Sequence, residues 1–86
     1  RETLEYMEIT SGYGISKIMV SPEMAGRSLE EAGFGNRLDK YNVSVVAIRR
    51  GRNPIVSPSK DEILQASDQL VVAAPEDTLE NLDVGR

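Results

Sequence analysis

The stretch NVSVVAIRRGRNPIVSP, residues 42–58, decides the fold of this chain. Residues 43–50 follow the two-residue period of a β-strand and are rich in β-branched side chains. Gly51 provides a turn, and a short strand returns between Pro54 and Pro58. Because proline cannot donate to a strand ladder, we expect the returning strand to lie near a sheet edge. The stretch therefore predicts an antiparallel hairpin.

Further elements follow on both sides of this hairpin. Residues 15–21 are rich in β-formers, and the nearly continuous apolar run 69–74 predicts a central strand. Ser28 followed by Glu31 is typical of a capped helix start, and residues 75–82 predict a closing helix. The sequence therefore predicts an α+β domain with the order β-α-β-β-β-α. It has one four-stranded, largely antiparallel sheet and short helices.

The domain is expected to occupy residues 15–86, after a linker or lead-in segment over residues 1–14, with residues 1–8 as a possible short helix. Because the chain begins with Arg1 and not methionine, we expect it to be part of a longer protein. The predicted core includes Leu70, Val72, Val46 and Ile48.

Composition excludes several functional classes. The 86 residues include no cysteine and no histidine, which removes Cys/His zinc sites, thiol nucleophiles and histidine bases. A net charge of −4 argues against nucleic acid as a partner. The acidic residues stand mainly where predicted helices begin, so helix capping explains them better than metal binding. No nucleophile is spaced with a base, so we expect neither an enzyme nor a metal site.

The ordered motifs resemble the C-terminal regulatory domain of potassium-transport proteins, the TrkA-C or RCK C-terminal family. The resemblance rests on GRSLEEAG (26–33), KYNVSVVAIRRG (40–51), NPIVSP (53–58), DEILQASDQLVVAA (61–74) and EDTLENL (76–82). It covers nearly everything from Ile15 to Leu82. Two departures stand out, because the link from Phe34 to Tyr41 is longer than usual and Asn42 replaces a common glycine.

The resemblance implies a cytoplasmic regulatory domain of a cation channel, transporter or antiporter, at the inner face of the membrane. It implies a homodimer, which the small size of the domain also favours. Such domains often follow a Rossmann-type nucleotide-binding domain, and in several members the dimer cleft binds cyclic di-AMP. We therefore expect cyclic di-AMP or another small ligand, and no covalently bound cofactor. The alternative is a ligand-free dimerisation module of the same kind of transport protein.

The candidate ligand site combines the segment before residues 43–50 with the returning strand. Arginine can hold a phosphate through two hydrogen bonds, and asparagine offers donors and an acceptor to a base edge. Isoleucine, valine and proline can form an apolar shelf for a purine. The predicted ligand-binding residues are Arg37, Leu38, Tyr41, Asn42, Val43, Ile55, Val56 and Pro58.

Asn42 and the three arginines of the hairpin also have purely structural interpretations. Asn42 can be a turn residue with a left-handed backbone, as its position opposite the family glycine suggests. Arg49, Arg50 and Arg52 can form a solvated hairpin tip that prevents edge pairing, or they can attract an anionic ligand or a partner domain. The sequence leaves both alternatives open.

Overall fold

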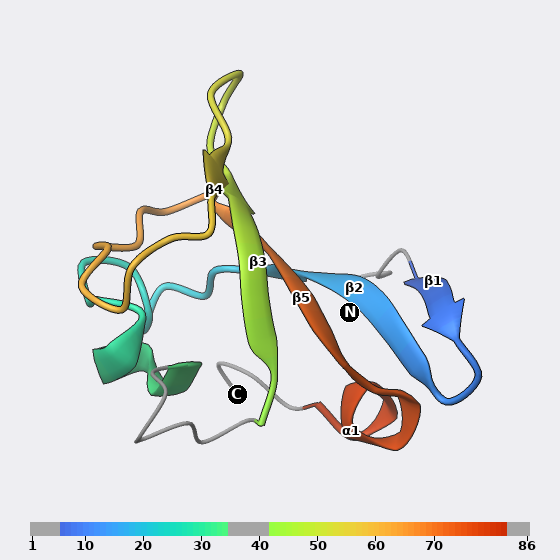
Figure 1. Ribbon diagram of the computed structural model, residues 1–86. Helices are drawn as coiled ribbons and strands as arrows, with labels where there is room; N and C mark the ends of the chain where they lie inside the picture. The colour runs from blue at the N-terminus through green and yellow to red at the C-terminus, as the bar shows by residue number, and fades with distance from the viewer. Residues whose placement is uncertain (1–5, 35–41, 83–86) are drawn as a thin grey trace.

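The computed structural model describes residues 6–34 and 42–82, and Figure 1 shows their arrangement. The strands are β1 (Tyr6–Thr10), β2 (Tyr13–Met19), β3 (Ser44–Arg49), β4 (Ile55–Val56) and β5 (Gln69–Pro75). Two short helical segments accompany them, η1 (Glu30–Phe34) and α1 (Glu76–Glu80). Within the described residues, no helix is long and apolar enough to cross a membrane. The described residues form an α+β domain, so the predicted fold class is confirmed.

All five strands belong to one sheet, in the order β1-β2-β5-β3-β4. Every pair of neighbours is antiparallel, and β5 lies at the centre between β2 and β3. The register places Leu70 of β5 opposite Ile18 on one side and Ile48 on the other. The prediction of a central strand over residues 69–74 is confirmed.

The sheet has five strands where the sequence analysis expects four, and the additional strand is β1. Residues 6–10 form an edge strand and not a linker or helix, because polar and apolar side chains alternate from Met7 onward. Gly12 turns the chain with a φ of 84°. The Tyr6 ring then covers Gly14 of β2, where any larger side chain would collide with it. Where the domain begins along the chain stays a prediction.

A bulge in β3 explains an error in the predicted core. The predicted core residues that are fully buried are Leu70, Val72 and Ile48. The prediction for Val46 is wrong, because this residue is 41% exposed. Val45 and Ala47 lie opposite consecutive residues of β5, so Val46 is an extra residue in the strand. Its carbonyl accepts a hydrogen bond from the Ser57 N–H at 2.9 Å.

The core covers one face of the sheet. Along β5, buried residues alternate with half-buried ones, as expected for a sheet with one covered face. The covering layer comes from residues 20–34, from Leu64 and from Leu79 of α1. On the opposite face, Val71 and Ala73 remain partly exposed in the single chain.

The helix start predicted at Ser28 is confirmed by two reciprocal hydrogen bonds. The Ser28 N–H donates to Glu31 Oε1 at 3.0 Å, and the Glu31 N–H donates to Ser28 Oγ at 3.1 Å. Gly33 has a φ of 105°, which ends regular helical geometry. The Phe34 N–H then reaches the Leu29 carbonyl at 2.9 Å, so η1 is a single wide turn.

Candidate functional site

Two surface pockets adjoin the start of β3, where Val43 and Ser44 line both. The first, here the Pro58 pocket, has a volume of about 470 Å³. Its lining residues are Leu29, Phe34, Val43, Ser44, Val45, Pro58, Ser59 and Lys60. Val43 and Pro58 belong to the predicted site, so two segments proposed from sequence do share one pocket.

Hydrogen bonds between distant segments hold the far wall of the Pro58 pocket. The Leu29 N–H donates to the Glu62 carbonyl at 2.9 Å, and the Glu30 N–H donates to the Lys60 carbonyl at 3.0 Å. Ser57, just before Pro58, adopts a left-handed φ of 51° and directs the chain from β4 into this wall. These hydrogen bonds therefore hold the backbone of this wall in place.

Lys60 is the cation of the Pro58 pocket. Its Nζ lies 3.8 Å from Glu30 Oε1 and 3.5 Å from Asp61 Oδ1, and the lysine side chain is 53% exposed. Exposed ion pairs of this kind contribute at most about 1 kcal/mol, so an anionic ligand can compete for the ammonium group. Sequence reasoning missed Lys60, because a lysine in a polar loop has no distinguishing pattern.

The second pocket, here the Tyr13 pocket, has a volume of about 370 Å³. Its lining residues are Ile9, Tyr13, Asn42, Val43, Ser44, Ala73, Ala74 and Pro75. Asn42 has a φ of 60°, as the turn interpretation requires. This conformation does not exclude a role in binding, because the residue also lines the pocket.

The structure therefore divides the predicted site residues. Asn42 lines the Tyr13 pocket, Pro58 lines the Pro58 pocket, and Val43 lines both. Ile55 and Val56 line neither of these two pockets: Ile55 packs against the core, and Val56 is 70% exposed. The remaining predicted residues, Arg37, Leu38 and Tyr41, lie outside the described residues.

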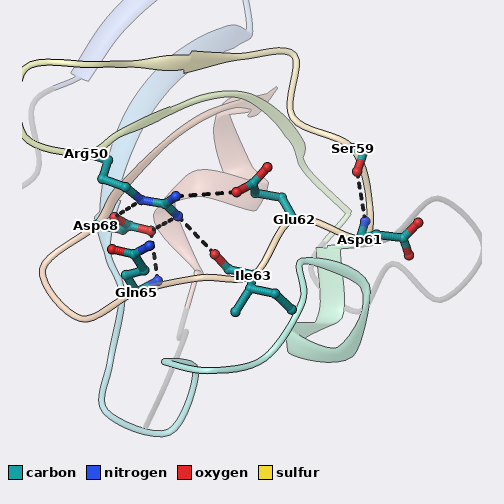
Figure 2. A network of polar contacts seen from close by, with 7 residues as sticks. All are labelled: Arg50, Ser59, Asp61, Glu62, Ile63, Gln65 and Asp68. Atoms are coloured by element: carbon teal, nitrogen blue, oxygen red, sulfur yellow. Dashed lines mark hydrogen bonds and ion pairs between the residues drawn. The ribbon is translucent and has the colours of Figure 1, made fainter.

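Arg50 forms a polar network that the sequence analysis did not find (Figure 2). Its Nε donates to Asp68 Oδ1 at 3.0 Å and its Nη2 donates to Asp68 Oδ2 at 2.8 Å. The same Nη2 donates to the Ile63 carbonyl at 2.9 Å, and Nη1 donates to Glu62 Oε2 at 3.4 Å. Asp68 is only 1% exposed, and its Oδ2 also accepts the Gln65 N–H at 2.9 Å. Arg50 is therefore a structural clamp between the β3–β4 hairpin and residues 62–68.

The network determines the ionisation of Asp68. Burial raises the pKa of this carboxyl group. Hydrogen bonds from Arg50 and the Gln65 N–H, together with the arginine charge, lower the pKa by more than burial raises it. The net result is a pKa below the ordinary value. The hydrogen bonds that Arg50 donates to Asp68 correspondingly raise the pKa of the guanidinium group. The pair therefore stays charged over the whole neutral range.

We expect the domain to lose stability in acid through this pair. Because the pKa of Asp68 is lower in the folded state, the unfolded state binds more protons once the pH falls below about 4. Stability from Asp68 is then present at neutral pH and is lost as the pH falls through the folded pKa. Urea unfolding at pH 7, 5 and 3 measures this, with Asp68→Asn as the control. Parallel losses in both proteins between pH 5 and pH 3 would contradict the assignment.

Within residues 6–34 and 42–82, no three acidic side chains are grouped so that they could hold a metal ion. The polar and apolar groups of the pockets fit an organic ligand with an anionic part better than a bare cation.

Comparison with known proteins finds a domain family that matches this chain and a protein that is similar to it. The sequence model of the TrkA-C domain matches residues 15–83. The Ktr system potassium uptake protein C of Bacillus subtilis (strain 168) is 32% identical over 69 residues. These residues cover 80% of this chain but only 30% of the relative, so the chain spans less than a third of that protein. Residues of β1 precede the matched range.

Solved structures share the fold. The RCK domain of GsuK has a TM-score of 0.69 at 24% identity, over 80% of this chain and 15% of that chain. The GsuK channel bound to NAD has a TM-score of 0.70 at 23% identity, over 81% and 13%. The RCK C domain of the potassium transport protein KtrA, in complex with cyclic di-AMP, has a TM-score of 0.68 at 24% identity, over 81% and 79%. At these identities the likeness establishes the fold.

Proposed function

Because the chain belongs to the TrkA-C domain family, we propose that it is a ligand-binding regulatory domain of a potassium or other cation transport protein. It acts without catalysis, at the cytoplasmic face of the membrane. Its partners are a second copy of itself and the rest of the transport protein, reached through a Rossmann-type domain. The relative from Bacillus subtilis is named as a potassium uptake protein, which supports this assignment.

The observation that carries the proposal is the Pro58 pocket. It is open at the surface, is lined by polar and apolar residues that include Lys60, and contains Val43 and Pro58 from the predicted site. A ligand with rings and an anionic group fits such a lining. The pocket would form half of a cleft between two copies. The exposed side chain of Val56 is then available to the partner copy, although it lines neither pocket of its own chain.

The proposed ligand is cyclic di-AMP, which the KtrA domain of similar fold binds. Arg37 would contact a phosphate. Asn42, which lines the adjoining Tyr13 pocket, would contact a base edge from that side. Leu38, Tyr41, Val43, Ile55, Val56 and Pro58 would supply the apolar surroundings of the purines. Ligand must favour one arrangement of the two copies over another, because equal affinity for both arrangements would shift nothing.

We expect Arg37→Ala to weaken the binding of cyclic di-AMP by about 1.5–3 kcal/mol, the usual contribution of a charge-assisted hydrogen bond. Titration calorimetry of both proteins measures the difference, and circular dichroism checks that folding is unchanged. Arg27→Ala is the matched control, because Arg27 is exposed and lines neither pocket. Equal affinities for wild type and Arg37→Ala would remove Arg37 from the site.

The second candidate function is dimerisation without a ligand. The partly exposed apolar face of β5 favours it, because a second copy would cover Val71 and Ala73. Thermal shift separates the two functions, since a ligand that binds only the folded state raises the melting temperature. A dimer whose melting temperature no cyclic dinucleotide, nucleotide or divalent cation raises would favour the ligand-free module.

A further inference from the structure

The start of β3 is a free edge of the sheet. The short strand β4 pairs only with Ala47 and Ile48, and Figure 1 shows it beside the opposite end of β3. Among the described residues, Ser44 and Val45 therefore have a strand partner on one side alone, which is β5. Ser44 is exposed and lines both the Pro58 pocket and the Tyr13 pocket. One extended ligand can therefore lie across this edge and enter both pockets.

The two pockets differ in charge. Among the described residues that line them, Lys60 is the one charged side chain, and it belongs to the Pro58 pocket. The Tyr13 pocket combines an aromatic ring and the Asn42 amide with small or apolar side chains. An anion placed there would lose hydration without gaining a cation, whereas an uncharged ring would lose little. The Tyr13 pocket therefore suits the uncharged part of a ligand, and the Pro58 pocket suits its anionic part.

Backbone contacts hold Tyr13 at the Tyr13 pocket. Tyr13 begins β2 and lies opposite Pro75, the last residue of β5. The Glu76 N–H donates to the Gly12 carbonyl at 2.7 Å, which ties the turn before Tyr13 to the start of α1. The Tyr13 side chain nevertheless remains 52% exposed. An aromatic ring that is exposed on a fixed backbone offers a stacking surface to a flat heterocycle at a small cost in entropy.

We propose that the Tyr13 pocket is the subsite for the base of a nucleotide ligand, with the Tyr13 ring as its stacking surface. The ligand then crosses the free edge at Ser44, and its phosphate lies in the Pro58 pocket near Lys60. The Asn42 amide belongs to the same subsite as the base whose edge it contacts. This inference rests on the proposed function and adds Tyr13 to it. Tyr13 precedes residues 15–83, so the family match does not include the stacking residue.

Replacing the Tyr13 ring tests its role in ligand binding. We expect Tyr13→Ala to weaken the binding of cyclic di-AMP at least about tenfold, and Tyr13→Phe to stay within about threefold of wild type, because phenylalanine keeps the stacking ring. Titration calorimetry measures the affinities, and thermal unfolding without ligand shows whether each variant is folded. Met7→Ala is the matched control, since Met7 is 66% exposed and lines neither pocket. Wild-type affinity in Tyr13→Ala would overturn the stacking role.

Ligand fragments locate the base on the wild-type chain, without any substitution. In NMR titrations, adenosine should shift the methyl signals of Ala73 and Ala74, which line the Tyr13 pocket. Ribose 5-phosphate should instead shift the side-chain signals of Lys60. Adenosine that leaves both alanines unchanged, or that shifts only Val45 in the Pro58 pocket, would overturn the base subsite.

The two experiments together distinguish the subsite from the proposed ligand. Adenosine bound at the two alanines, with no binding of cyclic di-AMP, would support the base subsite and reject cyclic di-AMP as the ligand. Tight binding of cyclic di-AMP that Tyr13→Ala leaves unchanged would support the proposed function and reject the subsite.

Discussion

Replacing Arg50 with methionine is expected to lower the free energy of unfolding by about 3–5 kcal/mol. The substitution leaves Asp68 only 1% exposed and without its cation, while the Gln65 N–H alone continues to bind the carboxylate. A buried charge that loses its partner is far more costly than a lost surface ion pair. Urea unfolding at pH 7 measures the effect.

Two further variants distinguish the loss of the Arg50 network from the general effect of removing an arginine. Arg52→Met removes the same charge from the exposed hairpin tip, and it should change stability by no more than about 0.5 kcal/mol. In the double variant Arg50→Met with Asp68→Leu, much of the lost stability should return, because no unpaired charge stays buried. Equal losses for Arg50→Met and Arg52→Met would show that the network contributes nothing.

Truncating Leu70 to alanine is expected to destabilise the domain by about 2–5 kcal/mol. Leu70 is fully buried at the centre of the sheet, between Ile18 and Ile48. Because β5 is paired on both sides, neighbouring side chains can collapse only partly into the cavity. Thermal and urea unfolding of the variant check this value.

The bulge residue supplies the control for Leu70. Val46 is 41% exposed, so Val46→Ala should cost much less than Leu70→Ala, on the order of 0.5 kcal/mol. Similar losses at the two positions would mean that β3 pairs with β5 without the bulge. That register would return Val46 to the core face that the sequence pattern predicts.

The central part of the fold could be predicted because its signals are local. The alternation of residues 43–50 and the apolar run 69–74 each determine a strand within a few residues. Gly51 determines the turn in the same local way. The bulge at Val46 could not be predicted, since it depends on how β3 meets β5. β1 was missed for a related reason: its residues are exposed and gain order from Gly14 and the rest of β2.

The candidate site could likewise be predicted only in part from the sequence. The predicted site joins Asn42, Val43 and Pro58, whereas the structure puts Val43 and Pro58 in one pocket and Asn42 in the other. Lys60 joins the pocket only through hydrogen bonds between segments that are distant in sequence. The Arg50 clamp likewise joins residues 18 positions apart. Of the three arginines at the hairpin tip, Arg50 is structural, whereas Arg49 and Arg52 are exposed. The charge pattern of the sequence alone cannot distinguish them.

We propose that a small anionic ligand binds in a cleft formed by two copies of this domain. Titration calorimetry of the wild-type chain with cyclic di-AMP, at a protein concentration where sedimentation shows the dimer, tests it most directly. We expect saturable binding of one ligand for every two chains. No detectable binding, or one ligand for every chain, would contradict a shared cleft.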